Sequence, residues 1–125
     1  MKKKIHVVDN EKITCDLVEA VLSGRYHIIK SYSGREALEK LSEQPDAILT
    51  DYRMPRMTGY DMAVKLRQSG YDGRIFLMSG NMDEVHENHG DAHRYFDGFL
   101  RKPFFPNMLV EFLNENLEKE RGMRA

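Results

Sequence analysis

Residues 47–51 read Ala-Ile-Leu-Thr-Asp, a largely apolar run that ends in a carboxylate. A run of this length and composition is typical of a strand that is buried on both faces, as in a parallel sheet. Similar short runs recur along the chain with amphipathic segments between them, and they lie at residues 5–8, 27–29, 75–78 and 96–100. The chain is therefore expected to alternate strands with helices.

The segment after the first run has apolar residues at helical spacing, and Gly24 follows it as a C-terminal stop. Ser33 and Glu36 have the spacing of a capping box, which predicts a second helix that ends near Ser42. The buried face of the first helix is expected to consist of Ile13, Leu17, Val18, Val21 and Leu22.

Three more helices complete the expected alternation. One lies around residues 62–66, and another in the polar, weakly periodic span 81–90, which is expected to bury little apolar surface. The last would bury an apolar face from Phe105 to Leu117, with Pro106 in its first turn. Strands and helices in this alternation predict a doubly wound α/β fold, in which helices cover both faces of a five-stranded parallel sheet.

The composition limits what such a fold can do. The length of 125 residues fits one domain, with an expected core at about residues 4–120. Lysine and arginine number 19 against 20 acidic residues, which argues against nucleic-acid binding through a strongly basic surface. The single cysteine, Cys15, excludes an internal disulfide and is interpreted as an inert thiol. No run approaches the roughly 20 apolar residues of a membrane span, so a cytoplasmic protein is expected.

Unusual polar residues follow four of the expected strands. In parallel α/β sheets, ligands bind outside the carboxyl ends of the strands, so these residues are expected to meet at one edge. They provide carboxylates, a hydroxyl and a lysine, which suit a hard cation such as Mg2+ and a phosphoryl group beside it. A carboxylate can also attack phosphorus. The residues are Asp9, Asn10 and Glu11 after the first strand, Asp51 after the third, Ser79, Gly80 and Asn81 after the fourth, and Arg101, Lys102 and Pro103 after the fifth.

Four motifs at these strand ends carry a resemblance to a known family. They are VVDNE at 7–11, DYRMPRMTG at 51–59, MSG at 78–80 and FLRKPF at 99–104. In this order they resemble the receiver domain of bacterial two-component response regulators, of which the stand-alone chemotaxis regulator is the simplest member. The resemblance covers about residues 4–117 and implies a single receiver domain, with a flavodoxin-like sheet of strand order 2-1-3-4-5.

The resemblance also implies roles for the residues after the first and third strands. Asp51 would accept a phosphoryl group from the phosphohistidine of a histidine kinase or phosphotransfer protein. Asp9, Asp51 and the backbone carbonyl of Arg53 would hold Mg2+, and Asn10 stands where the family usually has an acidic ligand. Glu11 is interpreted instead as a favourable charge at the N-terminus of the first helix.

At the later strands, the resemblance implies that Lys102 pairs with the phosphate and that Ser79 hydrogen-bonds to it. Phe99 stands at the family's aromatic switch position, so Ser79 and Phe99 would signal to a face made by the fourth helix, fifth strand and fifth helix. That face would bind an output protein or an effector domain outside this chain, without direct contact to nucleic acid or membrane. Arg53 and Asn81 would tune the lifetime of the phosphate. The only catalysis expected is of the protein's own phosphorylation and dephosphorylation.

Three other interpretations stay open. A receiver-like adaptor that no longer takes phosphate is compatible with Asn10. An aspartyl-phosphate phosphatase would need a second acid two residues after the nucleophile, where Arg53 stands. A flavin electron carrier would need a phosphate-binding loop rich in Ser, Thr and Gly after the first strand, where residues 9–11 are Asp-Asn-Glu. The histidines near the fourth helix are interpreted as a solvated face rather than a metal site; they are His86, His89 and His93.

Overall fold

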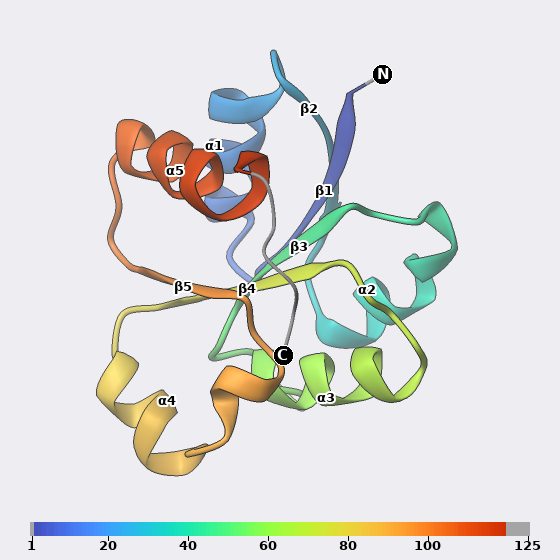
Figure 1. The fold of residues 1–125 in the computed structure, drawn as a ribbon, viewed down its shortest axis with the longest axis vertical. Helices are drawn as coiled ribbons and strands as arrows, with labels where there is room; N and C mark the ends of the chain where they lie inside the picture. Colours follow the sequence, from blue (N-terminus) through green and yellow to red (C-terminus); the bar gives the residue numbers. More distant parts are fainter. Residues whose placement is uncertain (1, 120–125) are drawn as a thin grey trace.

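The computed structural model describes residues 2–119 and shows a parallel sheet with helices on both faces (Figure 1). Within these residues the five strands, β1 to β5, are Lys3–Val8, Tyr26–Ser31, Ala47–Asp51, Arg74–Ser79 and Gly98–Arg101. Every neighbouring pair is parallel, and the order across the sheet is β2-β1-β3-β4-β5. The predicted doubly wound fold and its strand order are confirmed.

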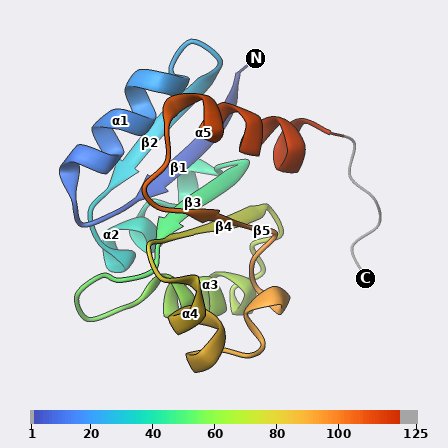
Figure 2. The same ribbon diagram turned by 90° about the vertical axis from the view of Figure 1, so that its left-hand side faces the viewer.

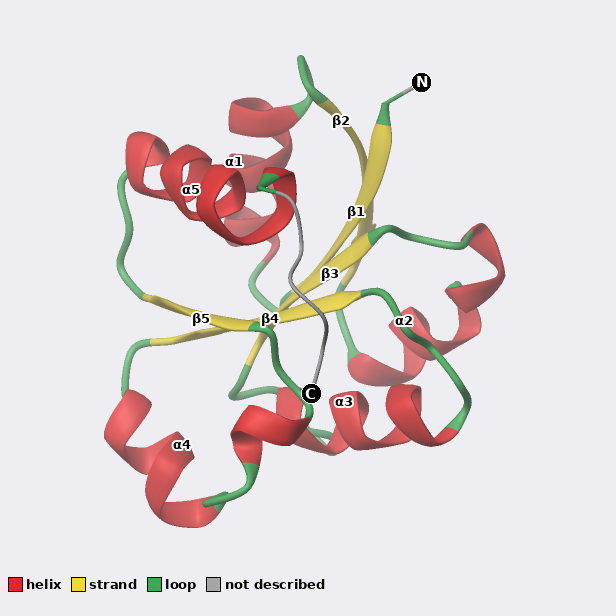
Figure 3. Cartoon of the chain, in the orientation of Figure 1, coloured by secondary structure: helices red, strands yellow, loops and turns green. Residues whose placement is uncertain are grey.

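In the described part of the chain, helices form a layer on each face of the sheet (Figure 2). α1 (Lys12–Leu22) and α5 (Pro106–Leu113) pack on one face, while α2 (Gly34–Glu39), α3 (Gly59–Gln68) and α4 (Met82–Asn88) cover the other. Short helical turns lie at Leu41–Glu43, Ala92–Arg94 and Asn114–Glu118, and Figure 3 distinguishes helices from strands by colour. None of the helices within residues 2–119 is long and apolar enough to cross a membrane.

The central strands β3 and β4 are mostly apolar because their successive side chains point into opposite layers, and both layers are covered. Ile5 and Val7 of β1 belong to the core beneath α1 and α5. Val8 and Ile48 belong to a second core beneath α2, α3 and α4. The covered sheet therefore holds the carboxyl ends of its strands at one solvent-facing edge.

The buried face of α1 differs from the one expected. Cys15, Val18 and Leu22 are buried, but Ile13 is 80% exposed and Leu17 is 39% exposed. The helix meets the sheet and α5 along a narrow line of positions, and its apolar residues extend further around the helix than this contact does. The prediction for Ile13 and Leu17 was wrong for that reason.

The start of α2 follows the predicted capping pattern only in part. Ser33 Oγ accepts a hydrogen bond from the N–H of Glu36 at 3.0 Å. The carboxylate of Glu36 accepts from the N–H of Tyr32 at 2.6 Å, one residue before the expected partner. Regular helix ends at Glu39, short of Ser42, and the turn Leu41–Glu43 continues the chain.

Expectations near the C-terminal half also need correction. Phe105 is 73% exposed because it precedes the first helical residue, Pro106, instead of joining the buried face of α5. β5 begins at Gly98 rather than Phe96, since pairing with β4 starts opposite Phe76. α4 is short and polar, but it buries Met82 and Val85.

His6 is a fully buried polar residue in the middle of β1. Its Nε2 and the Ser31 hydroxyl share a hydrogen bond of 2.6 Å, while its Nδ1 has no partner among the described residues. Burial, aided by the charge of Lys40 and opposed by that of Glu36, lowers the pKa of His6 from 6.5 to about 4. The folded protein therefore holds a neutral imidazole inside its core.

We predict that acid destabilises the protein through His6. Between pH 6.5 and 4 the unfolded chain binds a proton on His6 that the folded protein does not, so stability falls as the pH falls through this window. His6→Gln cannot titrate at this position. When the pH is lowered from 7 to 4, its free energy of unfolding, measured with urea, should fall by roughly 3 kcal/mol less than that of wild type. His27→Gln, on the exposed side of β2, serves as the control. Equal losses in wild type and His6→Gln would contradict the prediction.

Candidate functional site

Three charged side chains meet at the carboxyl edge of the sheet. Asp51 is the last residue of β3 and is 7% exposed, and Asp9 follows β1 and is fully buried. Lys102 follows β5, and its Nζ donates to Asp9 Oδ2 at 3.0 Å and to Asp51 Oδ1 at 3.2 Å. The parallel sheet thus brings together three of the predicted site residues from separate strands.

The charges in this cluster shift one another's pKa values. Burial and the neighbouring charge of Asp9 raise the pKa of Asp51, despite the opposing effect of Lys102. Burial also works to lower the pKa of Lys102, but its bonds to Asp9 and the charge of Asp51 outweigh this and raise it. Lys102 is therefore held as an ammonium group that compensates two acids.

The segment after β1 fixes Asp9 by its own backbone. Asp9 Oδ1 accepts the N–H of Glu11 at 2.9 Å, and the Cys15 thiol donates to the Asp9 carbonyl oxygen at 3.6 Å. Burial raises the pKa of Cys15 to about 11, which agrees with the inert thiol expected. The Glu11 carboxylate lies 3.9 Å from Lys102, so Glu11 joins the rim of the site as well as preceding α1.

The loop after β3 returns tightly onto the end of that strand. The N–H of Gly59 donates to the carbonyl oxygen of Tyr52 at 2.9 Å. A Cβ atom at Gly59 would collide with the backbone carbonyl of Asp51, so only glycine fits here. Thr58 caps α3, accepting from the N–H of Asp61 at 3.1 Å. This packing fixes the backbone that carries Asp51.

An open cavity of about 750 Å³ lies over the cluster. It contains most of the residues proposed from sequence, together with their neighbours. Asp9 lies buried beside it, bonded to Lys102. The lining residues are Asn10, Glu11, Asp51, Arg53, Ser79, Gly80, Asn81, Lys102 and Pro103.

Ser79 and Phe99 differ in their relation to the cavity. Ser79 lines it, and its Oγ accepts the N–H of Asn81 at 3.0 Å. Phe99 is a half-buried residue of β5 outside the cavity, with its ring 5.3 Å from that of His86 and 5.8 Å from that of Phe96. Phe99 therefore connects the last strand with α4 rather than contacting Asp51.

The Lys102–Pro103 peptide bond is cis.

Arg53 and Asn81 both contact the same residue of α4. The Arg53 guanidinium pairs with the Glu84 carboxylate through two nitrogens, with Nε 3.0 Å from Oε1. Asn81 Oδ1 caps the helix by accepting the Glu84 N–H at 3.0 Å. Sequence reasoning missed Glu84, because the polar sequence of α4 does not show which side faces the site.

The three histidines do not form a cluster. His89 stacks on Tyr60 with ring centroids 3.7 Å apart, and its Nε2 shares a hydrogen bond of 2.9 Å with the Tyr52 hydroxyl. The prediction of a solvated face is wrong for His89. It agrees with the exposure of His86 and His93. Among residues 2–119, no three His, Cys, Asp or Glu side chains converge as a metal-binding group. A cation at Asp9 and Asp51 would thus need oxygen ligands from the backbone or water.

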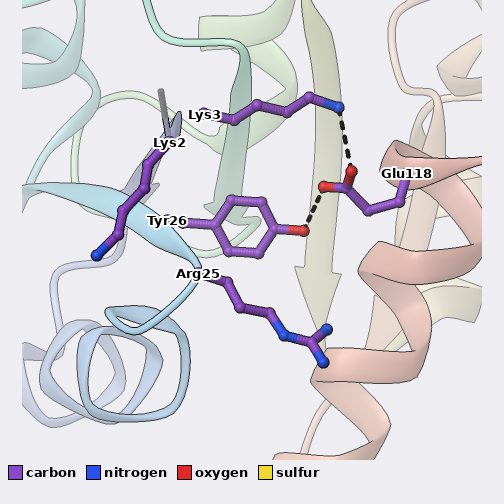
Figure 4. Close-up of a pocket in the computed structure, with 5 residues that line it drawn as sticks. All are labelled: Lys2, Lys3, Arg25, Tyr26 and Glu118. Atoms are coloured by element: carbon purple, nitrogen blue, oxygen red, sulfur yellow. Dashed lines mark hydrogen bonds and ion pairs between the residues drawn. The ribbon is translucent and has the colours of Figure 1, made fainter.

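A second cavity lies at the opposite edge of the sheet, beside the first residues of β1 and β2 (Figure 4). Lys2, Lys3 and Arg25 make it basic, but Glu118 also lines it. The Glu118 carboxylate accepts from Lys3 Nζ at 3.2 Å and from the Tyr26 hydroxyl at 2.5 Å (Figure 4). These contacts of Glu118 therefore attach the turn after α5 to the sheet.

Comparisons with known proteins agree with this geometry. Residues 5–114 match the family model of the response regulator receiver domain. The chain is 33% identical over 106 residues to the response regulator MprA of Mycolicibacterium vanbaalenii, covering 83% of this chain and 46% of that protein. It is 32% identical over 108 residues to the alkaline phosphatase synthesis transcriptional regulatory protein PhoP of Bacillus subtilis, covering 85% and 45%. The chain thus spans less than half the length of these relatives.

One similar solved structure is the chemotaxis protein CheY4 of Vibrio cholerae. The two chains superpose with a TM-score of 0.83 at 29% identity, over 94% of this chain and 100% of the other. The similarity therefore extends over nearly the whole described fold.

We predict that Asp51→Asn stabilises the fold at neutral pH. The raised pKa of Asp51 means that ionisation costs folding free energy once the pH exceeds the ordinary value of 3.8, and asparagine removes this cost. The gain in the urea midpoint should be largest near pH 7 and shrink as the pH falls towards 3.8. The exposed Asp72→Asn is the control. A loss of stability at pH 7 in Asp51→Asn would show that Lys102 more than compensates the charge.

Proposed function

Because this chain belongs to the response regulator receiver domain family, we propose that it is the phosphoacceptor module of a two-component system, with Asp51 as acceptor. The observation that carries the proposal is the Lys102 bridge between two buried carboxylates beside an open cavity. Two acids held this close are costly to the fold, and such costly clusters concentrate at functional sites.

In the proposed reaction, an Asp51 carboxylate oxygen attacks the phosphorus of a donor phosphohistidine. An O–P bond forms as the P–N bond breaks, and the electron pair of the broken bond stays on the imidazole nitrogen, which takes up a proton. Lys102 would follow the phosphoryl oxygens and neutralise their charge. Attack by water on phosphorus later restores the carboxylate and releases inorganic phosphate.

The residues present fit Mg2+, the cofactor that receivers typically bind at this position. We propose that Asp9, Asp51 and the backbone carbonyl of Arg53 hold it, since hard oxygen ligands suit this ion and it retains several waters. When bound, the ion supplies charge neutralisation for the phosphoryl oxygens. Asn10 lies exposed on the cavity lining, where it could contribute only a neutral oxygen as a weak ligand.

The proposed output runs through Ser79 and Phe99 to the α4–β5–α5 face. Ser79 Oγ accepts from Asn81, so its own hydrogen is available to a phosphoryl oxygen. Phe99 contacts His86, so a change of its rotamer would reach α4 directly. We also propose that Arg53 and Asn81, on the cavity lining, tune the lifetime of the phosphate.

The proposed partners are a histidine kinase or phosphotransfer protein as donor and an output protein or effector domain as receiver of the signal. Receiver domains of this family interact with both kinds of partner. We propose a cytoplasmic location and no direct nucleic-acid or membrane contact. The organisation as a single receiver domain stays a prediction, because the relatives extend well beyond the matched region.

Phosphorylation by acetyl phosphate with Mg2+ tests the proposed function. Mass spectrometry should show one added phosphoryl group on wild type and on the Asp72→Asn control, and none on Asp51→Asn, because Asp51 lines the cavity and accepts from Lys102, whereas Asp9 lies buried beside it. Label on Asp51→Asn would contradict the assignment. An unlabelled wild type would favour the adaptor interpretation.

We further predict that Asn10→Asp binds Mg2+ about 5- to 30-fold more tightly than wild type. An added carboxylate attracts the ion, and desolvation and repulsion from Asp9 and Asp51 offset all but roughly 1–2 kcal/mol of that attraction. The chain has no tryptophan, so calorimetry or tyrosine emission is the readout. Asn107→Asp, exposed on α5, matches the charge change away from the cavity. Equal affinity in wild type and Asn10→Asp would show that position 10 does not face the ion.

A further inference from the structure

Arg53 is the one basic side chain besides Lys102 among the residues that line the cavity. It lies two residues after Asp51, yet its guanidinium is paired with Glu84 on the first turn of α4. The Arg53 side chain is 74% exposed and that of Glu84 is 23% exposed. The pair therefore joins the loop after Asp51, where Arg53 lines the cavity, to the first turn of α4.

A pair with one largely exposed partner is weak, because water solvates the Arg53 guanidinium and screens its attraction to Glu84. A phosphoryl group on Asp51 would add a charge approaching two units and several oxygens within the same cavity. Guanidinium binds phosphate and carboxylate with similar bidentate geometry, so the more highly charged group is the stronger competitor. Arg53 would thus have two alternative acceptors, the Glu84 carboxylate and a phosphoryl group on Asp51.

We propose that Glu84 is a positioning residue that holds Arg53 away from Asp51, and that phosphorylation transfers Arg53 from Glu84 to the phosphoryl group. This inference rests on the proposed function. In the unphosphorylated protein the pair ties α4 to the loop after β3. In the phosphorylated protein Arg53 shields the acyl phosphate from water, and the first turn of α4 loses this tether.

Contacts on α4 limit the effect to its first turn. Met82 and Val85 remain in the core, and Asn81 still caps the Glu84 N–H. The far end of the helix is held independently by His89, through Tyr52 and Tyr60. Loss of the Arg53 tether would therefore alter the exposed start of the helix without unfolding it.

The test compares Glu84→Gln, Arg53→Gln and the double variant with wild type, each phosphorylated by acetyl phosphate, and follows loss of the phosphoryl group after donor removal. Glu84→Gln removes the competing carboxylate, so Arg53 should stay on the phosphoryl group and lengthen its half-life by about two- to fivefold. In the Arg53→Gln background the same change should have no effect. Glu87→Gln, exposed on the same helix, matches the charge change and should behave as wild type.

A second measurement follows Arg53 itself. The Nε–H resonance of Arg53 should shift when beryllofluoride is added to wild type, and Glu84→Gln should shift it partway before any addition. A half-life in Glu84→Gln equal to that of wild type or Glu87→Gln, or a change that persists without Arg53, would overturn the inference while leaving the proposed function intact. Absence of phosphorylation in wild type would overturn both.

Discussion

The arrangement of the site depends on one ammonium group, that of Lys102. Asp9 follows β1 and Asp51 ends the adjacent strand β3, and Lys102 reaches both from β5, on the far side of β4. The Lys102 N–H also donates to the Ser79 carbonyl at 2.9 Å, which fixes the start of the lysine side chain beside β4. Two buried carboxylates without this cation would repel each other and lose their solvation, so the edge could not keep its shape.

The rest of the fold tolerates this cluster because it is otherwise apolar and well covered. Side chains of the strands fill two cores, and the polar residues are displaced to the strand ends. Among the described residues, His6 is a fully buried ionisable side chain in the interior of a strand, and it stays neutral there. The charged cluster thus lies at the strand ends, where solvent can still enter, and the sheet supports it from behind.

Continuous apolar runs and strand-end motifs are local signals, so they were sufficient to predict the parallel sheet and the residues around Asp51. The strand order was predicted only through the resemblance to receiver domains. It was insufficient where a residue's partner is distant. Ile13 and Leu17 belong to the apolar pattern of α1, but the extent of burial depends on how α5 packs beside it. Nothing local to His89 indicates that it stacks on Tyr60. The role of Glu84 was not predicted for the same reason, since its partner Arg53 lies on another element.

The contacts of His89 bear on how α4 can move. One end of the helix is attached through Arg53 and the other through Tyr52, so consecutive residues of the chain hold both ends. A displacement of that dipeptide as a whole would translate the helix. Loss of the Arg53 contact alone would leave His89 as a fixed pivot, and the helix would tilt about its C-terminal end. The direction of motion at the surface would then depend on which of the two contacts is released.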